Sequence, residues 1–269
     1  MNTFFQKTLF KKTLLGLSIT SVLTAVNMLS MTQAIAQEVG KSTNITQNNL
    51  QIETSIRKAV EAKIGNNIKV DEVRPSPLSG LYEVRLGNDI IYVDKTAEFL
   101  IAGSIQQLKT GKNYTQERMN TLATAAVFSP ENKVNALKLV KGDGSRQLVL
   151  FEDVNCGYCK KLRVELEKVN NITVYTYLVP ILSQDSEDKM RGVWCAKDRN
   201  KAYDDWMLKG IAPAPAQKSC QVPVDKNQTL ARSLRVQGTP AMFFTNGKRV
   251  PGYAKAEQIE QYLSAAAQK

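Results

Sequence analysis

The sequence contains no histidine, and only four of its 269 residues are cysteines. The lack of histidine excludes His-assisted nucleophiles, His general bases and most catalytic zinc sites. No run of Lys and Arg interleaved with aromatic residues is present, and no repeat or low-complexity segment occurs. Although the formal charge is +11, we therefore expect a solvated basic surface and no nucleic-acid partner. The remaining candidates for chemistry are the cysteines: Cys156, Cys159, Cys195 and Cys220.

The first 36 residues have the layout of a secretory signal peptide. Three lysines precede an apolar stretch, Leu14–Met28, and the small residues Ala34 and Ala36 follow it. This layout predicts that residues 1–36 are a signal peptide cleaved after Ala36, which leaves a charge of +8. The alternative is an uncleaved membrane anchor, but polar residues interrupt the apolar stretch. Export would place the cysteines in an oxidising compartment.

The next segments predict a small N-terminal domain over residues 37–112. After a polar lead-in over 37–49, apolar residues at helical spacing predict a helix over 52–64 that ends at Gly65. Short alternating segments then predict an antiparallel sheet, with strands over 68–73, 81–86, 90–93, 99–101 and 105–108. A unit this small is marginally stable, so we expect a second copy to pair with it. A helix over 115–128 would lie in a linker, 113–131.

The remaining residues, 132–269, predict a second domain that mixes helices and strands. An apolar strand over 147–151 precedes the first cysteine pair, and Asn246-Gly247 predicts a hairpin between 241–244 and 248–250. The other expected elements are a helix after the pair, a strand over 172–179, helical segments over 185–208, a helix over 225–234 capped by Asp225, and a final helix over 255–267.

Cys156-Gly157-Tyr158-Cys159 follows a strand and opens a helix. At a helix N-terminus the unpaired N–H groups and the helix dipole favour a thiolate, so Cys156 is the candidate nucleophile. Cys159, one helical turn later, could resolve a mixed disulfide. Gly157 would keep the turn uncrowded, and Tyr158 would place an aromatic ring beside the sulfur. The alternatives are half of a zinc site, which lacks suitable further ligands here, and a static disulfide.

Two further features support this interpretation. Cys195 and Cys220 are expected to form a structural disulfide, although a second redox-active or intermolecular pair stays possible. Thr239-Pro240 precedes a predicted strand, where a proline cannot donate a ladder hydrogen bond, so a tight turn is expected there, with a cis peptide bond as one option.

These motifs together resemble the DsbC branch of the bacterial periplasmic DsbC/DsbG thiol:disulfide interchange proteins. The resemblance implies a thioredoxin-like catalytic domain with a helical insertion, joined through the linker helix to an α+β dimerisation domain. It implies a V-shaped homodimer in the periplasm, without a cofactor or metal, that acts on misfolded or misoxidised exported proteins and is kept reduced by a membrane electron donor of the DsbD type. The residues that carry the resemblance are Cys156-Gly157-Tyr158-Cys159, Trp194-Cys195-Ala196-Lys197-Asp198, Gly238-Thr239-Pro240, Asn246-Gly247 and Val250-Pro251-Gly252-Tyr253.

By this resemblance Cys156 attacks, Cys159 resolves, Pro240 is the cis-proline, Thr239 shapes substrate contact, and Cys195–Cys220 is the structural bridge. The sequence departs from the family pattern at Lys160, where many relatives have histidine. Leu150 stands where thioredoxins carry a buried acid, so the proton acceptor for Cys159 is open between Glu152 and Asp153.

The function expected is disulfide isomerase or reductase. The alternatives are an oxidase of the DsbA type, a DsbG-like reductase of folded or sulfenylated partners, and a dimeric chaperone without enzyme activity.

Overall fold

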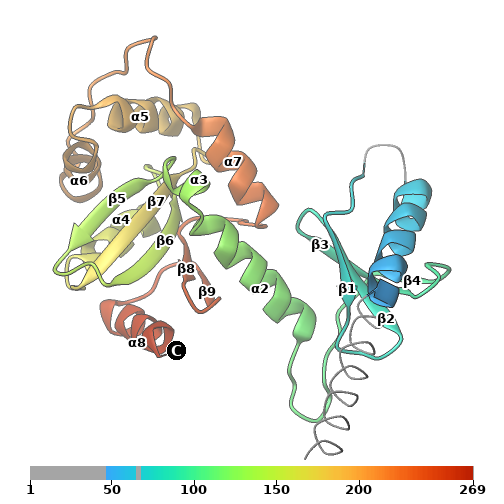
Figure 1. Cartoon of the computed structure of the whole chain (residues 1–269). Coiled ribbons are helices and arrows are strands. Elements are labelled where there is room, and N and C mark those ends of the chain that lie inside the picture. Colours follow the sequence, from blue (N-terminus) through green and yellow to red (C-terminus); the bar gives the residue numbers. More distant parts are fainter. Residues whose placement is uncertain (1–46, 65–67, 269) are drawn as a thin grey trace, which may run out of the picture.

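The computed structural model describes residues 47–64 and 68–268, which form two sheet-containing parts connected by a helix (Figure 1). The predicted signal peptide, residues 37–46 of the predicted lead-in, and Gly65 lie outside the described residues. Residues 47–49, which we expected in the lead-in, belong to a helix over 47–64. Among the described helices, none has the length and apolarity needed to span a bilayer.

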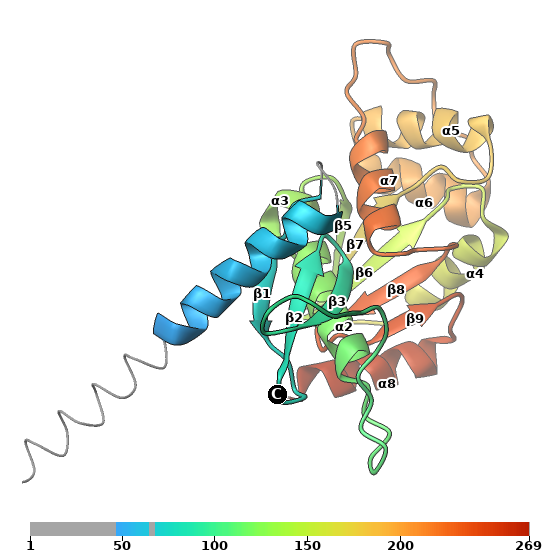
Figure 2. The ribbon, with the colours of Figure 1, turned by 90° about the vertical axis from the view of Figure 1, so that its right-hand side faces the viewer.

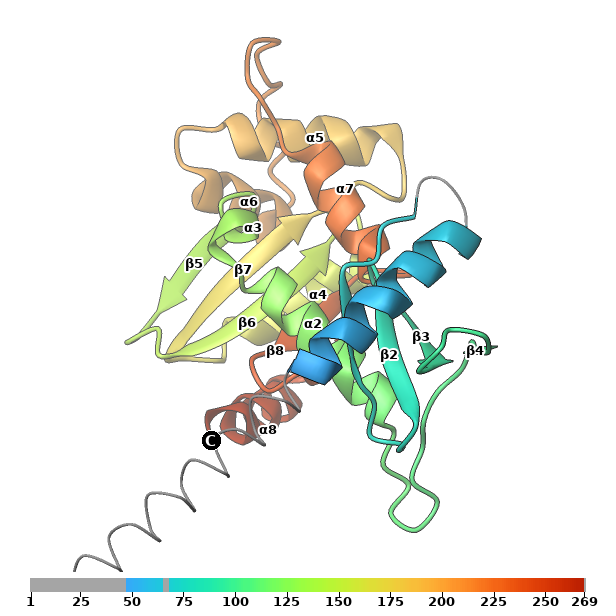
Figure 3. The ribbon, with the colours of Figure 1, turned by 45° about the vertical axis from the view of Figure 1, so that its right-hand side comes forward.

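The N-terminal part consists of the helix over 47–64 packed on a four-stranded antiparallel sheet (Figures 2 and 3). The helix lies along the sheet because one face of each element is apolar, and these faces bury a small common core. The core residues are Ile56, Val60, Val70, Val73, Val84 and Val93. The strands, in the order β1-β2-β3-β4, are β1 (Glu72–Pro75), β2 (Leu81–Leu86), β3 (Asp89–Asp94) and β4 (Leu100–Ile101).

Two predictions for this sheet were wrong. The first strand was expected over 68–73, but β1 runs to Pro75, because β1 is an edge strand, where proline is tolerated. The segment 105–108 forms only an isolated bridge between Gln106 and Asn113. The chain turns there, with Gly111 at a φ of 71°, so no neighbouring strand is available for pairing.

The connecting helix, α2 (Tyr114–Val127), contacts both parts of the chain. Asn113 caps it by accepting the N–H of Gln116, which satisfies one free donor of the first turn. Near its start, Arg118 pairs with Glu83 of the small sheet, with Nε and Oε1 3.0 Å apart. Near its end, Val127 is buried in the core of the second part. A short helix, α3 (Pro130–Lys133), follows at once.

The second part is built on a five-stranded sheet of order β5-β7-β6-β8-β9. β6 and β7 are parallel and are joined by α4 (Gly157–Leu166), whereas the other neighbours are antiparallel. β5 was not predicted: it is an edge strand that carries Lys138 and Lys141, and Leu137 is the one buried residue of its five, which weakens its apolar signal. The strands are β5 (Leu137–Lys141), β6 (Arg146–Glu152), β7 (Ile172–Leu178), β8 (Ala241–Phe244) and β9 (Arg249–Pro251).

Helices cover both faces of this sheet. Along β6, Leu148 and Leu150 join a core with α4 and α8 (Ala256–Ala267), whereas Val149 and Phe151 join a core with α2 and α7 (Val224–Ser233). This alternation explains why the whole β6 segment is apolar: both of its faces are buried. The predicted hairpin at Asn246-Gly247 is confirmed, with Gly247 at a φ of 89°.

The predicted helical insertion consists of α5 (Gln184–Cys195) and α6 (Arg199–Lys209), which lie with α7 at one end of the sheet (Figure 1). These helices pack against the cysteine segment in a third apolar cluster. The predicted capping of α7 by Asp225 was wrong. Pro223 occupies the N-cap position without a side-chain hydrogen bond, and Asp225 lies in the first turn, where its charge favours the helix dipole.

Candidate active site at the start of helix α4

Cys156 stands at the N-cap position of α4, four residues after the end of β6. Its sulfur accepts the N–H of Cys159 at 3.4 Å, and its thiol donates to the carbonyl of Thr239 at 3.3 Å. A backbone N–H and a helix start aimed at the sulfur stabilise negative charge on it. Cys156 keeps 7% of its surface exposed, whereas Cys159 is fully buried. Cys156 is therefore the sulfur that an incoming disulfide can reach.

The Thr239–Pro240 peptide bond is cis, and the carbonyl of Thr239 lies against the Cys156 sulfur. Cys156 and Thr239, which the sequence analysis placed in one site, are therefore in contact. The carbonyl of Pro240 accepts the N–H of Gly252 at 2.7 Å, which ties the proline to the segment after β9.

Gly157 and Tyr158 follow Cys156 as the first two residues of α4. Tyr158 is 61% exposed. A Cβ built on Gly157 would meet no atom within 4 Å, so crowding does not require glycine there. The missing side chain instead keeps the approach to the sulfur open.

The buried cysteine has an environment unlike that of Cys156. Burial, followed by the negative charge of Glu152, raises the pKa of the Cys159 thiol well above its ordinary value. Cys159 therefore needs a proton acceptor before it can act as a nucleophile.

Glu152, the last residue of β6, has the properties that a proton acceptor for Cys159 needs. Its side chain is fully buried, and one carboxyl oxygen accepts the hydroxyl of Tyr203 from α6. The other oxygen has no hydrogen-bond partner among the described residues. Burial raises the pKa of Glu152 to about 7, against the opposing effects of the Tyr203 hydrogen bond and the charge of Arg163. This carboxyl can therefore hold or release a proton near neutral pH.

Asp153, the second candidate acceptor, is committed to the backbone. One carboxyl oxygen accepts the N–H of Asn155 at 2.8 Å, and the other accepts those of Ile181 and Leu182 at 2.8 and 3.0 Å. These bonds fix the loop that carries Ile181 and Leu182, both about half exposed, beside the cysteine segment. The structure therefore separates a structural aspartate from a titratable glutamate.

Residues of the insertion that the sequence reasoning missed complete the site. Tyr203 and Trp206 are three positions apart on α6, so they share a face that points at the cysteine segment. The indole N–H of Trp206 donates to the Val154 carbonyl at 2.7 Å. The ammonium of Lys160 lies 3.9 Å from the centre of the Trp206 ring, so this lysine forms a cation–π contact with helix α6 of the insertion. In the sequence, the only signal was the i, i+3 spacing of the two aromatic residues.

Cys195 and Cys220 form a disulfide within the chain, with their Cα atoms 6.1 Å apart. The bridge joins the end of α5 to the loop before α7 and packs at the edge of the cluster that holds Cys156 and Cys159. Because both sulfurs are used, these cysteines cannot complete a four-cysteine zinc site.

A thioredoxin-like sheet that carries two neighbouring thiols at a helix start, with one sulfur against the residue before a cis-proline, defines a thiol–disulfide oxidoreductase. Residues 134–267 match the family model of the thioredoxin-like domain, and residues 33–116 match that of the disulfide bond isomerase protein N-terminal domain.

Relatives give the family within this class. The probable thiol:disulfide interchange protein DsbC of Bordetella pertussis is 44% identical over 194 residues, which cover 72% of this chain and 68% of the relative. The thiol:disulfide interchange protein DsbC of Escherichia coli K12 is 31% identical, over 75% of this chain and 84% of the relative. A solved structure of a disulfide interchange protein from Neisseria gonorrhoeae is 35% identical over 51% of this chain and 99% of that chain, with a TM-score of 0.48.

The chain belongs to the DsbC family of thiol:disulfide interchange proteins. It is thus an enzyme of disulfide exchange, and the activity of its family is periplasmic disulfide isomerisation.

Proposed function

We propose that Cys156 performs the attack on substrate disulfides. The Cys156 thiolate attacks one sulfur of a wrong disulfide, the substrate S–S bond breaks, and the second substrate sulfur leaves as a thiolate. That thiolate can attack another disulfide of the same substrate, which forms a new disulfide and frees a different substrate thiolate. A substrate thiolate then attacks the substrate sulfur bonded to Cys156, so that a second new disulfide forms and Cys156 leaves as its thiolate. The observation that carries this proposal is the partly exposed Cys156 sulfur, which accepts a helix N–H beside the Thr239 carbonyl.

Cys159 provides the escape route when a substrate does not resolve itself. Its thiolate attacks the Cys156 sulfur, which releases the reduced substrate and leaves a Cys156–Cys159 disulfide. We assign Glu152 as the acceptor of the Cys159 proton. One oxygen of its buried carboxyl has no hydrogen-bond partner among the described residues, and its charge is close enough to raise the pKa of the Cys159 thiol. The oxidised pair then needs two electrons, and the proposed source is a membrane donor of the DsbD type.

The substrates proposed are misfolded or misoxidised exported proteins. Tyr158, Ile181 and Leu182 offer exposed apolar side chains on segments next to the reactive sulfur, which suits exposed apolar parts of unfolded chains. The same surface favours a second, weaker function: holding unfolded chains without chemistry. The proposal includes export to the periplasm with cleavage after Ala36.

The N-terminal domain, proposed as residues 37–112, would hold two copies of the chain together. Its edge strand β4 is paired on one side only, and Phe99, Leu100 and Ile101 are each about half exposed or more. An unpaired apolar edge is suited to pairing with another copy. The linker, 113–131, would then place the two catalytic domains, 132–269, around a common cleft.

Light scattering on the mature protein tests the homodimer. We expect a dimer, and we expect Leu100→Lys to convert it to a monomer, because a lysine at this edge opposes pairing. Val140→Lys is the matched control: Val140 is equally exposed, at 51%, but lies on β5 of the other domain. A monomeric mature protein would remove the cleft from the proposal.

Refolding of scrambled ribonuclease tests the chemistry. Cys156→Ser should abolish the recovery of activity, yet suppress aggregation as the unaltered protein does. Cys159→Ser should keep part of the isomerase activity, because self-resolving substrates do not need the second thiol. Full isomerase activity of Cys156→Ser would refute the assignment of the nucleophile.

A further inference from the structure

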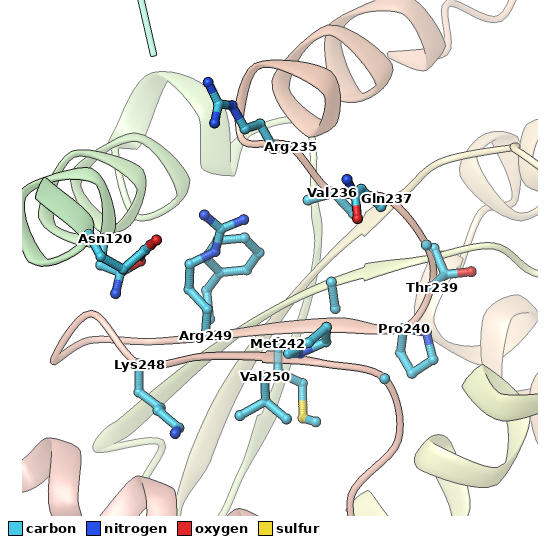
Figure 4. A pocket seen from close by; sticks show the side chains of 16 residues that line it. Asn120, Arg235, Val236, Gln237, Thr239, Pro240, Met242, Lys248, Arg249 and Val250 are labelled. Carbon is cyan, nitrogen blue, oxygen red and sulfur yellow. Dashed lines mark hydrogen bonds between the residues drawn. The ribbon is translucent and has the colours of Figure 1, made fainter. Parts of the chain in front are cut away.

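A groove of about 600 Å³ begins at Thr239 and Pro240, beside the reactive sulfur, and extends along the edge of the sheet to α2 (Figure 4). This volume lies within the range of about 300–1,000 Å³ that is typical of ligand sites. The groove is walled by the loop 235–240, by β8 and β9, and by Gln116 and Asn120 of α2. None of the residues that line it is acidic, whereas three are cationic. Its charge is therefore one-sided.

Arg249 provides the strongest feature of this groove. Its guanidinium lies over the Phe243 ring, 4.7 Å from the ring centre, and donates one hydrogen bond to the carbonyl of Leu234. No carboxylate of the described residues forms an ion pair with it. Burial, followed by the charge of Arg235, lowers its pKa. Most of its five N–H donors are thus left for a ligand.

Arg235 faces Arg249 from the loop before Thr239 (Figure 4). Its backbone φ is 54°, in the left-handed region that glycine adopts more readily, yet the position carries an arginine. Its exposed guanidinium pairs with Asp89, which is itself 64% exposed, so this pair is open to water and to exchange. The third cation, Lys248, points to the other side of the sheet edge, 5.3 Å from the centre of the Tyr262 ring (Figure 4). Two neighbouring guanidiniums therefore form one wall of the groove.

We propose that this groove binds an extended segment of the substrate polypeptide, and that Arg249, assisted by Arg235, pairs with the carboxylate of an Asp or Glu in that segment. The inference rests on the proposed attack by Cys156, which tethers the substrate at the Thr239 end of the groove. The substrate is held through the disulfide between its cysteine and Cys156, and the groove continues from this point. Substrate residues on one side of that cysteine therefore lie along the groove, next to Arg235 and Arg249. Because no carboxylate of the protein lines the groove, its two guanidiniums favour a planar anion of the ligand, such as a carboxylate. The enzyme thus prefers disulfides that have an acidic residue a few positions away.

Peptides with a single cysteine, activated as a mixed disulfide with a chromogenic thiol, test this preference. The set carries Glu or Gln at each position on either side of the cysteine, and stopped-flow absorbance measures the second-order rate of thiol release. At the best position, we expect the Glu peptide to react about fivefold to tenfold faster than its Gln counterpart, as one charge-assisted contact provides. This ratio should fall at high salt.

The variant Arg249→Gln should bring the ratio close to one. The matched control is Arg232→Gln, which removes an exposed cation on α7 outside the groove and should keep the ratio. Because Arg249 is half-buried, Arg235→Glu gives a second route: it should lower the rate of the Glu peptide and raise that of a Lys peptide at the same position.

A ratio of one at every position in the unaltered protein would refute the acidic subsite, while reaction of the Gln peptides would still support Cys156 chemistry. If no peptide reacted, the proposed function itself would fail. Oxidised glutathione, which carries carboxylates without a polypeptide, is the third arm. An Arg249 dependence seen with glutathione but not with the peptides would overturn the peptide assignment.

Discussion

Substitution of Glu152 by Gln should change how the stability of the protein depends on pH. Glu152 has an ordinary pKa of 4.5 that burial raises to about 7 in the folded chain. Between these values the unfolded chain has lost a proton that the folded chain keeps, so the free energy of unfolding falls as pH rises. The difference between the two pKa values corresponds to a loss of about 3 kcal/mol in the free energy of unfolding, and this loss is complete above pH 7. A glutamine does not titrate and escapes this loss.

We therefore expect the stability of Glu152→Gln, relative to the unaltered protein, to rise by about 3 kcal/mol from pH 4.5 to pH 8. A constant difference of about 1–3 kcal/mol, from the altered hydrogen bonding of the buried amide, does not affect this slope. The other groups that face this carboxyl, Tyr203, Arg163 and Cys159, are present in both proteins. Urea unfolding at a series of pH values, with Cys156 and Cys159 oxidised so that neither titrates, measures the difference.

Tyr203→Phe is the companion variant, because the Tyr203 hydroxyl lowers the pKa of Glu152. Its loss should move the pH window upwards. A stability difference that stays constant from pH 4.5 to pH 8 in Glu152→Gln would refute a titrating carboxyl at this position.

The same substitution should separate the two reactions of the enzyme. Loss of a general base typically costs about a hundredfold or more in rate, so resolution of a mixed disulfide by Cys159 should slow by that order. Isomerisation of scrambled ribonuclease should persist, because it does not require Cys159 to lose its proton. An unchanged reductase rate would assign the proton to another acceptor.

Three stability predictions concern the catalytic domain and are measured by urea unfolding. Replacement of Cys195 and Cys220 by Ala should cost about 3–4 kcal/mol, because the bridge closes a loop of 25 residues; a loss below about 1 kcal/mol would contradict this. Tyr177→Phe should cost about 1–3 kcal/mol, since it strips the buried carbonyl of Val127 of its 2.8 Å hydrogen bond; no loss would mean that this carbonyl finds another donor. Phe151→Ala should cost about 3–5 kcal/mol, because Phe151 is fully buried between two aromatic rings; a loss of about 1 kcal/mol would show that the core collapses around the gap.

The sequence was most informative where local pattern and tertiary structure agree. The apolar segment 147–151 became a strand covered on both faces, and Asn246-Gly247 became a hairpin. The position of Cys156 at a helix start also follows from local order along the chain. Each of these signals depends on a few adjacent residues.

Features that depend on distant contacts could not be predicted in this way. Glu152 and Asp153 are adjacent acids, and only the fold separates them: Asp153 meets the N–H groups of Ile181 and Leu182, whereas Glu152 meets Tyr203. The strand β5 escaped prediction because only one of its five residues, Leu137, is buried. Arg235 and Arg249 likewise line one groove because the fold brings together two segments that are separate in the sequence.

The central claim, that Cys156 is the nucleophile and Cys159 resolves its mixed disulfides, is tested most directly by trapping. Cys159→Ser should accumulate covalent complexes with exported proteins, and mass spectrometry after alkylation should place the linkage on Cys156. Cys156→Ser should accumulate none, because the remaining thiol is fully buried. Complexes linked through Cys159, or an absence of complexes in Cys159→Ser, would contradict the account.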